Sequence, residues 1–140
     1  MIKIFMVKNN QSFHIRSKIW VEDRSGKVVF GLGRLKIIEA ISRLGSIQAA
    51  AKELKMSYRA VWGRIKATEE RLNQPILIRN IGGASGGGSQ LTPFAQKLVE
   101  QFYKLHRCII KESDRQYREI LEHHLDSNIL TKPVKKDNPR

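Results

Sequence analysis

The residues best placed for chemistry in this sequence are small or cationic and recur at helical spacing. Arg59, Gly63 and Lys66 lie three to four residues apart. At about 100° per residue they share one side of a helix, with Arg64 on its flank. Arginine can form two hydrogen bonds with guanine, and lysine binds phosphate as a point charge. This face predicts contact with nucleic acid, although each cation alone could equally be a solvated surface charge.

Two serines precede predicted helices in positions that suit N-caps. Ser46 stands before the alanine-rich run 47–55, and Ser57 before a helix from Tyr58 to about Leu72. Helix N-termini present backbone N–H groups and are natural phosphate sites, so Ser46, Ser57 and Tyr58 are candidate phosphate ligands. Glycine costs about 1 kcal/mol in a helix interior, so Gly63 on the outer face predicts close approach to a ligand.

The opposite side of the same helix is apolar. Tyr58, Val61, Trp62, Ile65 and Leu72 cluster there. Trp62 lies between the two faces, and we expect it to pack in the core rather than contact a base. The helix therefore has one side for packing and one for recognition.

A glycine-rich segment at 82–89 lies between two predicted short strands, 74–81 and 90–92. A hairpin with so small a tip can lie along a groove or a phosphate backbone, and Arg79 at its base adds charge. The candidate contacts here are Arg79, Gly82, Gly83, Ser85 and Gly86. The segment lacks the lysine of a phosphate-binding loop, and a simple hinge is the alternative.

The charge balance agrees with a polyanionic partner. The 140 residues hold 26 Lys and Arg against 13 Asp and Glu, a formal net charge of +13. No apolar run approaches the ~20 residues that span a bilayer, so we expect no membrane partner. Cys108 is the single cysteine, which suits a reducing compartment and a cytoplasmic protein.

The sequence offers little support for a metal site or a catalytic site. His106 and Cys108 are two residues apart and His123 and His124 are adjacent, so neither pair shares a helix face. No nucleophile–base pair or acidic cluster is evident. We expect neither a metal site, nor a cofactor, nor enzyme activity.

The surrounding elements predict a mainly α fold with small β elements, a winged helix-turn-helix. Residues 13–31 suggest a β-hairpin, with a further edge strand at 2–7. A helix over 34–44 ends at Gly45. Thr92 and Pro93 begin a long helix that extends to about Leu125. The expected divisions are an N-terminal hairpin at 1–31, a winged domain at 32–92 with its wing at 75–92, the long helix at 93–125, and a disordered tail at 126–140.

The long helix carries apolar residues spaced by four, three and four, the spacing of a helix-pairing seam. A homodimer is therefore expected to pair through Leu98, Phe102, Leu105 and Ile109.

Residues 33–105 resemble the N-terminal domain of the molybdate-dependent transcriptional regulators, the ModE family, and more distantly the DNA-binding domain of LysR-type regulators. The resemblance rests on Gly45-Ser46-Ile47 with Ala49-Ala50, on the run Met56 to Trp62, and on Gly82 to Gly88 followed by Leu91-Thr92. It implies a dimeric winged helix-turn-helix whose recognition helix opens at Ser57, Tyr58 and Arg59.

The sequence departs from that family after the long helix, because about 15 residues follow and no molybdate- or tungstate-sensing domain fits there. The expectation is a short, stand-alone form whose effector signal would come from a partner protein. The leading interpretation is a sequence-specific transcriptional regulator of double-stranded DNA, with helix 57–72 in the major groove and the wing 82–89 beside it. The alternative is an architectural or adaptor protein without sequence preference, acting through protein–protein contacts.

Overall fold

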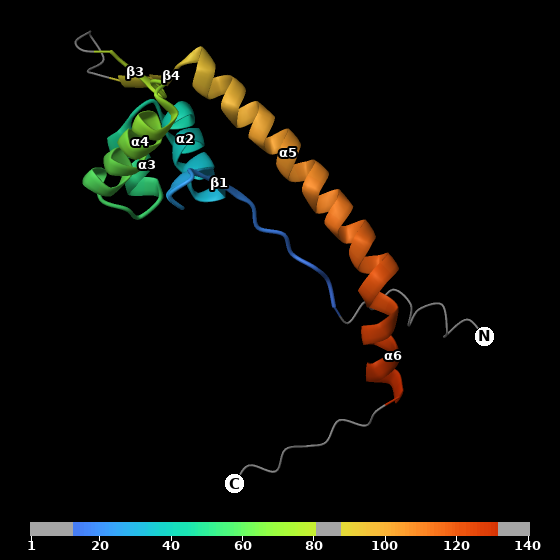
Figure 1. Cartoon of the computed structure of the whole chain (residues 1–140). Helices are drawn as coiled ribbons and strands as arrows, with labels where there is room; N and C mark the ends of the chain where they lie inside the picture. The colour runs from blue at the N-terminus through green and yellow to red at the C-terminus, as the bar shows by residue number, and fades with distance from the viewer. Residues whose placement is uncertain (1–12, 81–87, 132–140) are drawn as a thin grey trace. The chain divides into compact units, whose positions relative to one another are not determined.

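The computed structural model describes residues 13–80 and 88–131 (Figure 1). For Asn80 and residues 128–131 it describes the backbone alone. Contacts divide them into a unit of residues 18–105 and a second unit of residues 13–17 and 106–131. In chain order the elements are β1 (Trp20–Glu22), β2 (Val28–Gly31), α2 (Leu32–Leu44), α3 (Ile47–Glu53), α4 (Tyr58–Leu72), β3 (Leu77–Asn80), β4 (Gly88–Leu91), α5 (Pro93–Tyr117), the π-helical η1 (Arg118–Glu122) and α6 (His123–Thr131).

The predicted N-terminal hairpin is present but shorter than expected. β1 pairs with β2 in antiparallel register, with Val21 opposite Phe30 and an irregularity between Val21 and Glu22. The Asp23 carboxylate accepts hydrogen bonds from the backbone N–H and hydroxyl of Ser25, at 2.9 and 2.6 Å, and from Lys27 N at 3.0 Å. These bonds lower the pKa of Asp23 and fix the turn. The expected edge strand at 2–7 lies outside the described residues.

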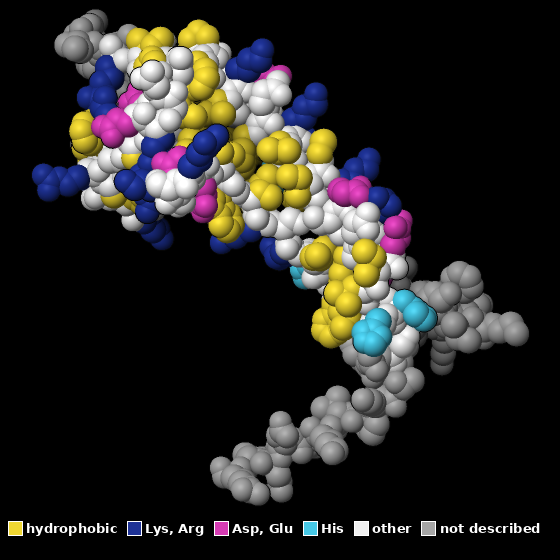
Figure 2. Space-filling model, in the orientation of Figure 1, with side chains coloured by type: hydrophobic (Ala, Val, Ile, Leu, Met, Phe, Trp, Pro, Cys, Tyr) yellow, Lys and Arg dark blue, Asp and Glu magenta, His cyan; other side chains and the backbone are white. Residues whose placement is uncertain are grey.

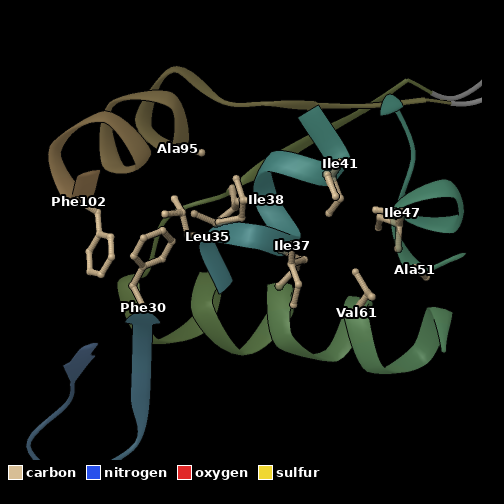
Figure 3. Packing of buried hydrophobic residues seen from close by; sticks show 14 of the residues in the cluster. Phe30, Leu35, Ile37, Ile38, Ile41, Ile47, Ala51, Val61, Ala95 and Phe102 are labelled. Carbon is tan, nitrogen blue, oxygen red and sulfur yellow. The ribbon is translucent and has the colours of Figure 1, made fainter. Parts of the chain in front are cut away.

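The core of the 18–105 unit is built around α2. Leu35, Ile37, Ile38 and Ile41 are almost fully buried. Val61 and Ile65 of α4 pack against them, and buried Ala50 and Ala51 give α3 its close approach to the core (Figure 3). The helix-turn-helix is therefore the centre of the fold rather than an appendage to it.

The end of the core nearest the hairpin is closed by two aromatic rings. Phe30 of β2 is 1% exposed, and its ring meets that of Phe102 edge to face, with centroids 5.1 Å apart and an interplanar angle of 78° (Figure 3). Such geometry is the favoured one for aromatic pairs. The pair joins the hairpin to α5 through the core.

The long C-terminal helix continues further than expected. α5 begins at Pro93 with Thr92 as its cap, the Thr92 hydroxyl accepting from Ala95 N at 3.1 Å, as predicted. Beyond α5, η1 and α6 extend helical structure to Thr131. The prediction of a helix end at 125 and a disordered tail from 126 was therefore wrong for residues 126–131. Residues 132–140 lie outside the described part.

Two of the residues expected to form a dimer seam pack inside the domain instead. Phe102 is 4% exposed in the aromatic pair with Phe30, and Leu98 packs against the same core. A four-three-four spacing marks an apolar helix face but does not say what covers it. Leu105, which is 47% exposed, and Ile109 remain accessible for pairing.

Candidate nucleic-acid interface

The candidate recognition surface lies on two capped helices, α3 and α4, and its position is fixed by the tight turn between α2 and α3. Gly45 ends α2 in the left-handed conformation, at φ 80°, and donates its N–H to Ile41 O at 2.8 Å. Ser46 then caps α3, its hydroxyl accepting from Ala49 N at 3.0 Å. Ser57 caps α4 in the same way, accepting from Ala60 N at 3.0 Å. Both predicted caps are confirmed. Each hydroxyl acts as the acceptor in its cap, and its proton can still be donated to another group.

The outer side of α4 faces solvent and is positively charged. Arg59, Gly63, Arg64 and Lys66 are exposed, and Figure 2 shows Lys and Arg side chains projecting from the region of α3 and α4. A Cβ added to Gly63 would meet nothing within 4 Å. Nothing in the described fold therefore requires glycine at this position. The open face is compatible with close approach of a ligand.

Trp62 does not occupy the core as predicted. It is 37% exposed, and Tyr58 is 48% exposed, whereas Val61, Ile65 and Thr68 form the buried side of α4. Lys66 Nζ lies 5.8 Å from the centroid of the Trp62 ring and 3.5 Å from Glu69 Oε1. The buried stripe of α4 is narrow, so the indole belongs to the exposed face and helps to position Lys66.

The strands of the wing are fixed to the helix-turn-helix. β3 pairs with β4 in antiparallel register, with exposed Arg79 opposite Ser89. Ser89 N donates to Gly45 O at 2.7 Å, which ties β4 to the turn between α2 and α3. The predicted wing contacts Gly82, Gly83, Ser85 and Gly86 lie outside the described residues.

A bridge of polar groups behind α4 was not predicted from the sequence. Arg34 Nη1 donates to Arg64 O at 2.5 Å and to Thr68 Oγ1 at 2.8 Å, and the Thr68 hydroxyl donates to Val29 O at 3.0 Å. Arg71 also donates to Val28 O. Burial, followed by the nearby Arg71 and Arg64 charges, lowers the pKa of Arg34. These contacts join residues 30 or more positions apart, and local periodicity gives no signal for them.

Replacing Ser57 with alanine is expected to lower the free energy of unfolding by about 1 kcal/mol, because Ala60 N loses its capping acceptor. Chemical denaturation followed by circular dichroism measures this change. Ser57→Asp is the matched control, since aspartate also caps helices and should retain most of the stability. Equal losses in both variants would contradict the capping role.

No metal-binding group and no helix long and apolar enough to span a membrane occur among the described residues. A winged helix-turn-helix is the fold that these elements define. Residues 32–96 match the family model described as bacterial regulatory helix-turn-helix protein, lysR family. This stretch, from α2 to the start of α5, is similar to the helix-turn-helix domain of that family.

Two curated relatives are similar to about half of the chain. The transcriptional regulator ModE of Haemophilus influenzae is 38% identical over 74 residues, 53% of this chain and 29% of the relative. The molybdenum transport protein ModE of Azotobacter vinelandii is 39% identical over 72 residues, 51% of this chain and 27% of the relative. The similarity thus spans less than a third of each relative.

One solved structure has the same fold. The DNA-binding domain of CbnR, crystallised in complex with DNA, superposes with a TM-score of 0.50 at 23% identity, covering 64% of this chain and 98% of that domain.

Proposed function

We propose that this protein is a sequence-specific, DNA-binding transcriptional regulator that acts as a homodimer in the cytoplasm. The observation that carries the proposal is the exposed outer face of α4, on which Arg59, Gly63 and Lys66 are held by a capped helix on a rigid core. The Haemophilus influenzae relative is a transcriptional regulator by name, which supports the same function.

In the proposed complex, α4 enters the major groove from its N-terminal end. Arg59 contacts base edges, while Lys66 and the hydroxyls of Ser57 and Tyr58 bind phosphates. The first turns of α3 and α4 contain no acidic residue. Their backbone N–H groups can therefore attract phosphate oxygens without repulsion from a carboxylate. The 82–89 wing contacts the adjacent backbone or minor groove. Binding needs no metal or cofactor in this proposal, and an effector signal comes from a partner protein.

A homodimer is supported by apolar side chains that remain accessible in the second unit. Ile109, Ile120 and Leu121 line an apolar hollow of about 420 Å³ together with Ile15 and the buried Tyr117. Ile120 is 73% exposed and Leu121 42% exposed. Large exposed apolar groups at such a density are typical of interaction surfaces. Two recognition helices in a dimer would read half-sites about 34 Å apart.

Selection from randomised duplex DNA tests the proposal. The expected result is an enriched sequence with two-fold symmetry and half-sites about one helical turn apart. Binding that depends on salt but enriches no sequence would contradict sequence-specific regulation. That outcome would favour the architectural or adaptor function instead.

A further inference from the structure

A cavity at the base of the β1–β2 hairpin is lined by cations that the proposed recognition of bases does not use. Its volume is about 280 Å³, and Lys18, Arg34 and Arg64 contribute to its wall together with Trp20, Gly31 and Gly33. In the part of the chain that the structure describes, no Asp or Glu lines it. Three positive charges around one hollow repel each other unless an anion lies among them.

The acidic groups nearest in the chain are already engaged elsewhere. Glu22 accepts a hydrogen bond from Trp20 Nε1 at 2.7 Å, and Asp23 closes the hairpin turn. Among the described residues, no ion pair involves Lys18, Arg34 or Arg64. The cavity therefore has a net positive charge that this part of the chain does not neutralise.

The donors of Arg34 are partly committed and partly free for a ligand. Nη1 is held by Arg64 O and Thr68 Oγ1, which fixes the plane of the guanidinium. A guanidinium carries five N–H donors, so Nε and Nη2 keep donors beyond these two bonds. Fixed, planar donors beside two further cations suit the oxygens of a phosphate group.

The position of Arg64 on α4 relates this cavity to bound DNA. Arg64 follows Gly63 and is rotated by about 100° from it and by about 140° from Arg59, so it lies on the flank of α4 that borders the buried side. It lies five residues from Arg59, which is about 7.5 Å along the helix axis. The major groove is about 12 Å wide, and phosphate strands border it on both sides. A flank residue of a helix in that groove faces one of these strands.

We propose that the cavity between the hairpin, α2 and α4 binds a backbone phosphate of the DNA strand bordering the groove that α4 occupies. The proposal rests on the proposed function, and it makes the N-terminal hairpin part of the DNA-binding surface. The hairpin base supplies Lys18, α2 supplies Arg34 and α4 supplies Arg64, so the phosphate contact fixes the register of α4 on the duplex.

The first test compares two double variants that each remove two positive charges. K18A/R64A removes two of the three cations in the cavity wall. K97A/R107A removes two exposed cations of α5 that are not part of the cavity. Affinity for the selected duplex and for a scrambled duplex is measured by fluorescence anisotropy between about 0.05 and 0.2 M salt. We expect K18A/R64A to weaken binding to both duplexes by about tenfold. The salt slope of the homodimer should fall by about 1.8, because each protomer loses the contribution of one phosphate, about 0.9. The control should change far less.

The second test locates the phosphate. Single backbone phosphates of the selected duplex are replaced with neutral methylphosphonates, one position at a time. Replacement at one position in each half-site should weaken binding of the wild-type protein and have no further effect on K18A/R64A. Circular dichroism confirms that both double variants are folded.

The proposal would be overturned if K18A/R64A matched the control, or if every methylphosphonate affected both proteins equally. It would also be overturned if inorganic phosphate raised the melting temperature of the wild-type protein but not of K18A/R64A, while DNA affinity stayed unchanged; the site would then bind a free anion. Failure of the proposed function is seen separately, as equal binding of the selected and scrambled duplexes, because the salt slope can be measured on either.

Discussion

Replacing Arg59 with alanine is expected to remove about 1–3 kcal/mol of discrimination between the selected duplex and a scrambled one. Arg59 is exposed in the first turn of α4, next to the Ser57 cap, where a recognition helix contacts base edges. Titration of both duplexes measures the change as the ratio of the two dissociation constants. Affinity for the scrambled duplex should fall much less than affinity for the selected one.

Lys66→Ala is the matched comparison on the same face. Lys66 is assigned to phosphate, so its loss should weaken both duplexes alike and lower the salt slope. Should Arg59→Ala also weaken both duplexes by the same factor, Arg59 would be a phosphate contact and the assignment to direct reading would be wrong.

Replacing Phe30 with alanine is expected to lower the free energy of unfolding by about 3–5 kcal/mol. The Phe30 ring is 1% exposed and closes the core between β2, α2 and α5. Its loss leaves a cavity at the point where the hairpin joins the domain. Thermal and denaturant unfolding followed by circular dichroism measure the loss.

A double-mutant cycle with Phe102→Ala isolates the ring pair. We expect a coupling of about 0.5–1.5 kcal/mol from the edge-to-face contact. Val28→Ala serves as the control for a change on the same strand, since Val28 is 36% exposed and should cost little. A similar loss from both strand variants would show that the aromatic pair is not what joins the hairpin to the core.

Local features of the fold could be predicted from the sequence. Ser46, Ser57 and Thr92 each cap a helix at the predicted position, because a cap needs only a side chain and the N–H two or three residues later. The left-handed end of α2 at Gly45 is equally local. The amphipathic spacing of α2 and α4 likewise predicts that each helix has one buried side and one exposed side.

Features that depend on distant parts of the chain could not be predicted. The spacing of apolar residues in α4 does not determine how wide the buried face of the helix is. The prediction that Trp62 packs in the core is therefore wrong. The spacing of Leu98 and Phe102 is the same for a dimer seam as for packing on the chain's own core. The bridge from Arg34 to Thr68 and Val29 spans α2, α4 and β2. The same three elements contribute to the wall of the cationic cavity at the base of the hairpin.

Recognition of a DNA sequence by α4 is tested most directly by the ratio of two dissociation constants. The wild-type protein is titrated at about 0.15 M salt with the duplex enriched by selection and with a scrambled duplex of equal length and composition. A regulator of this kind should bind the enriched duplex at least about 10³-fold more tightly. Equal affinity for the two duplexes would contradict sequence-specific recognition by α4.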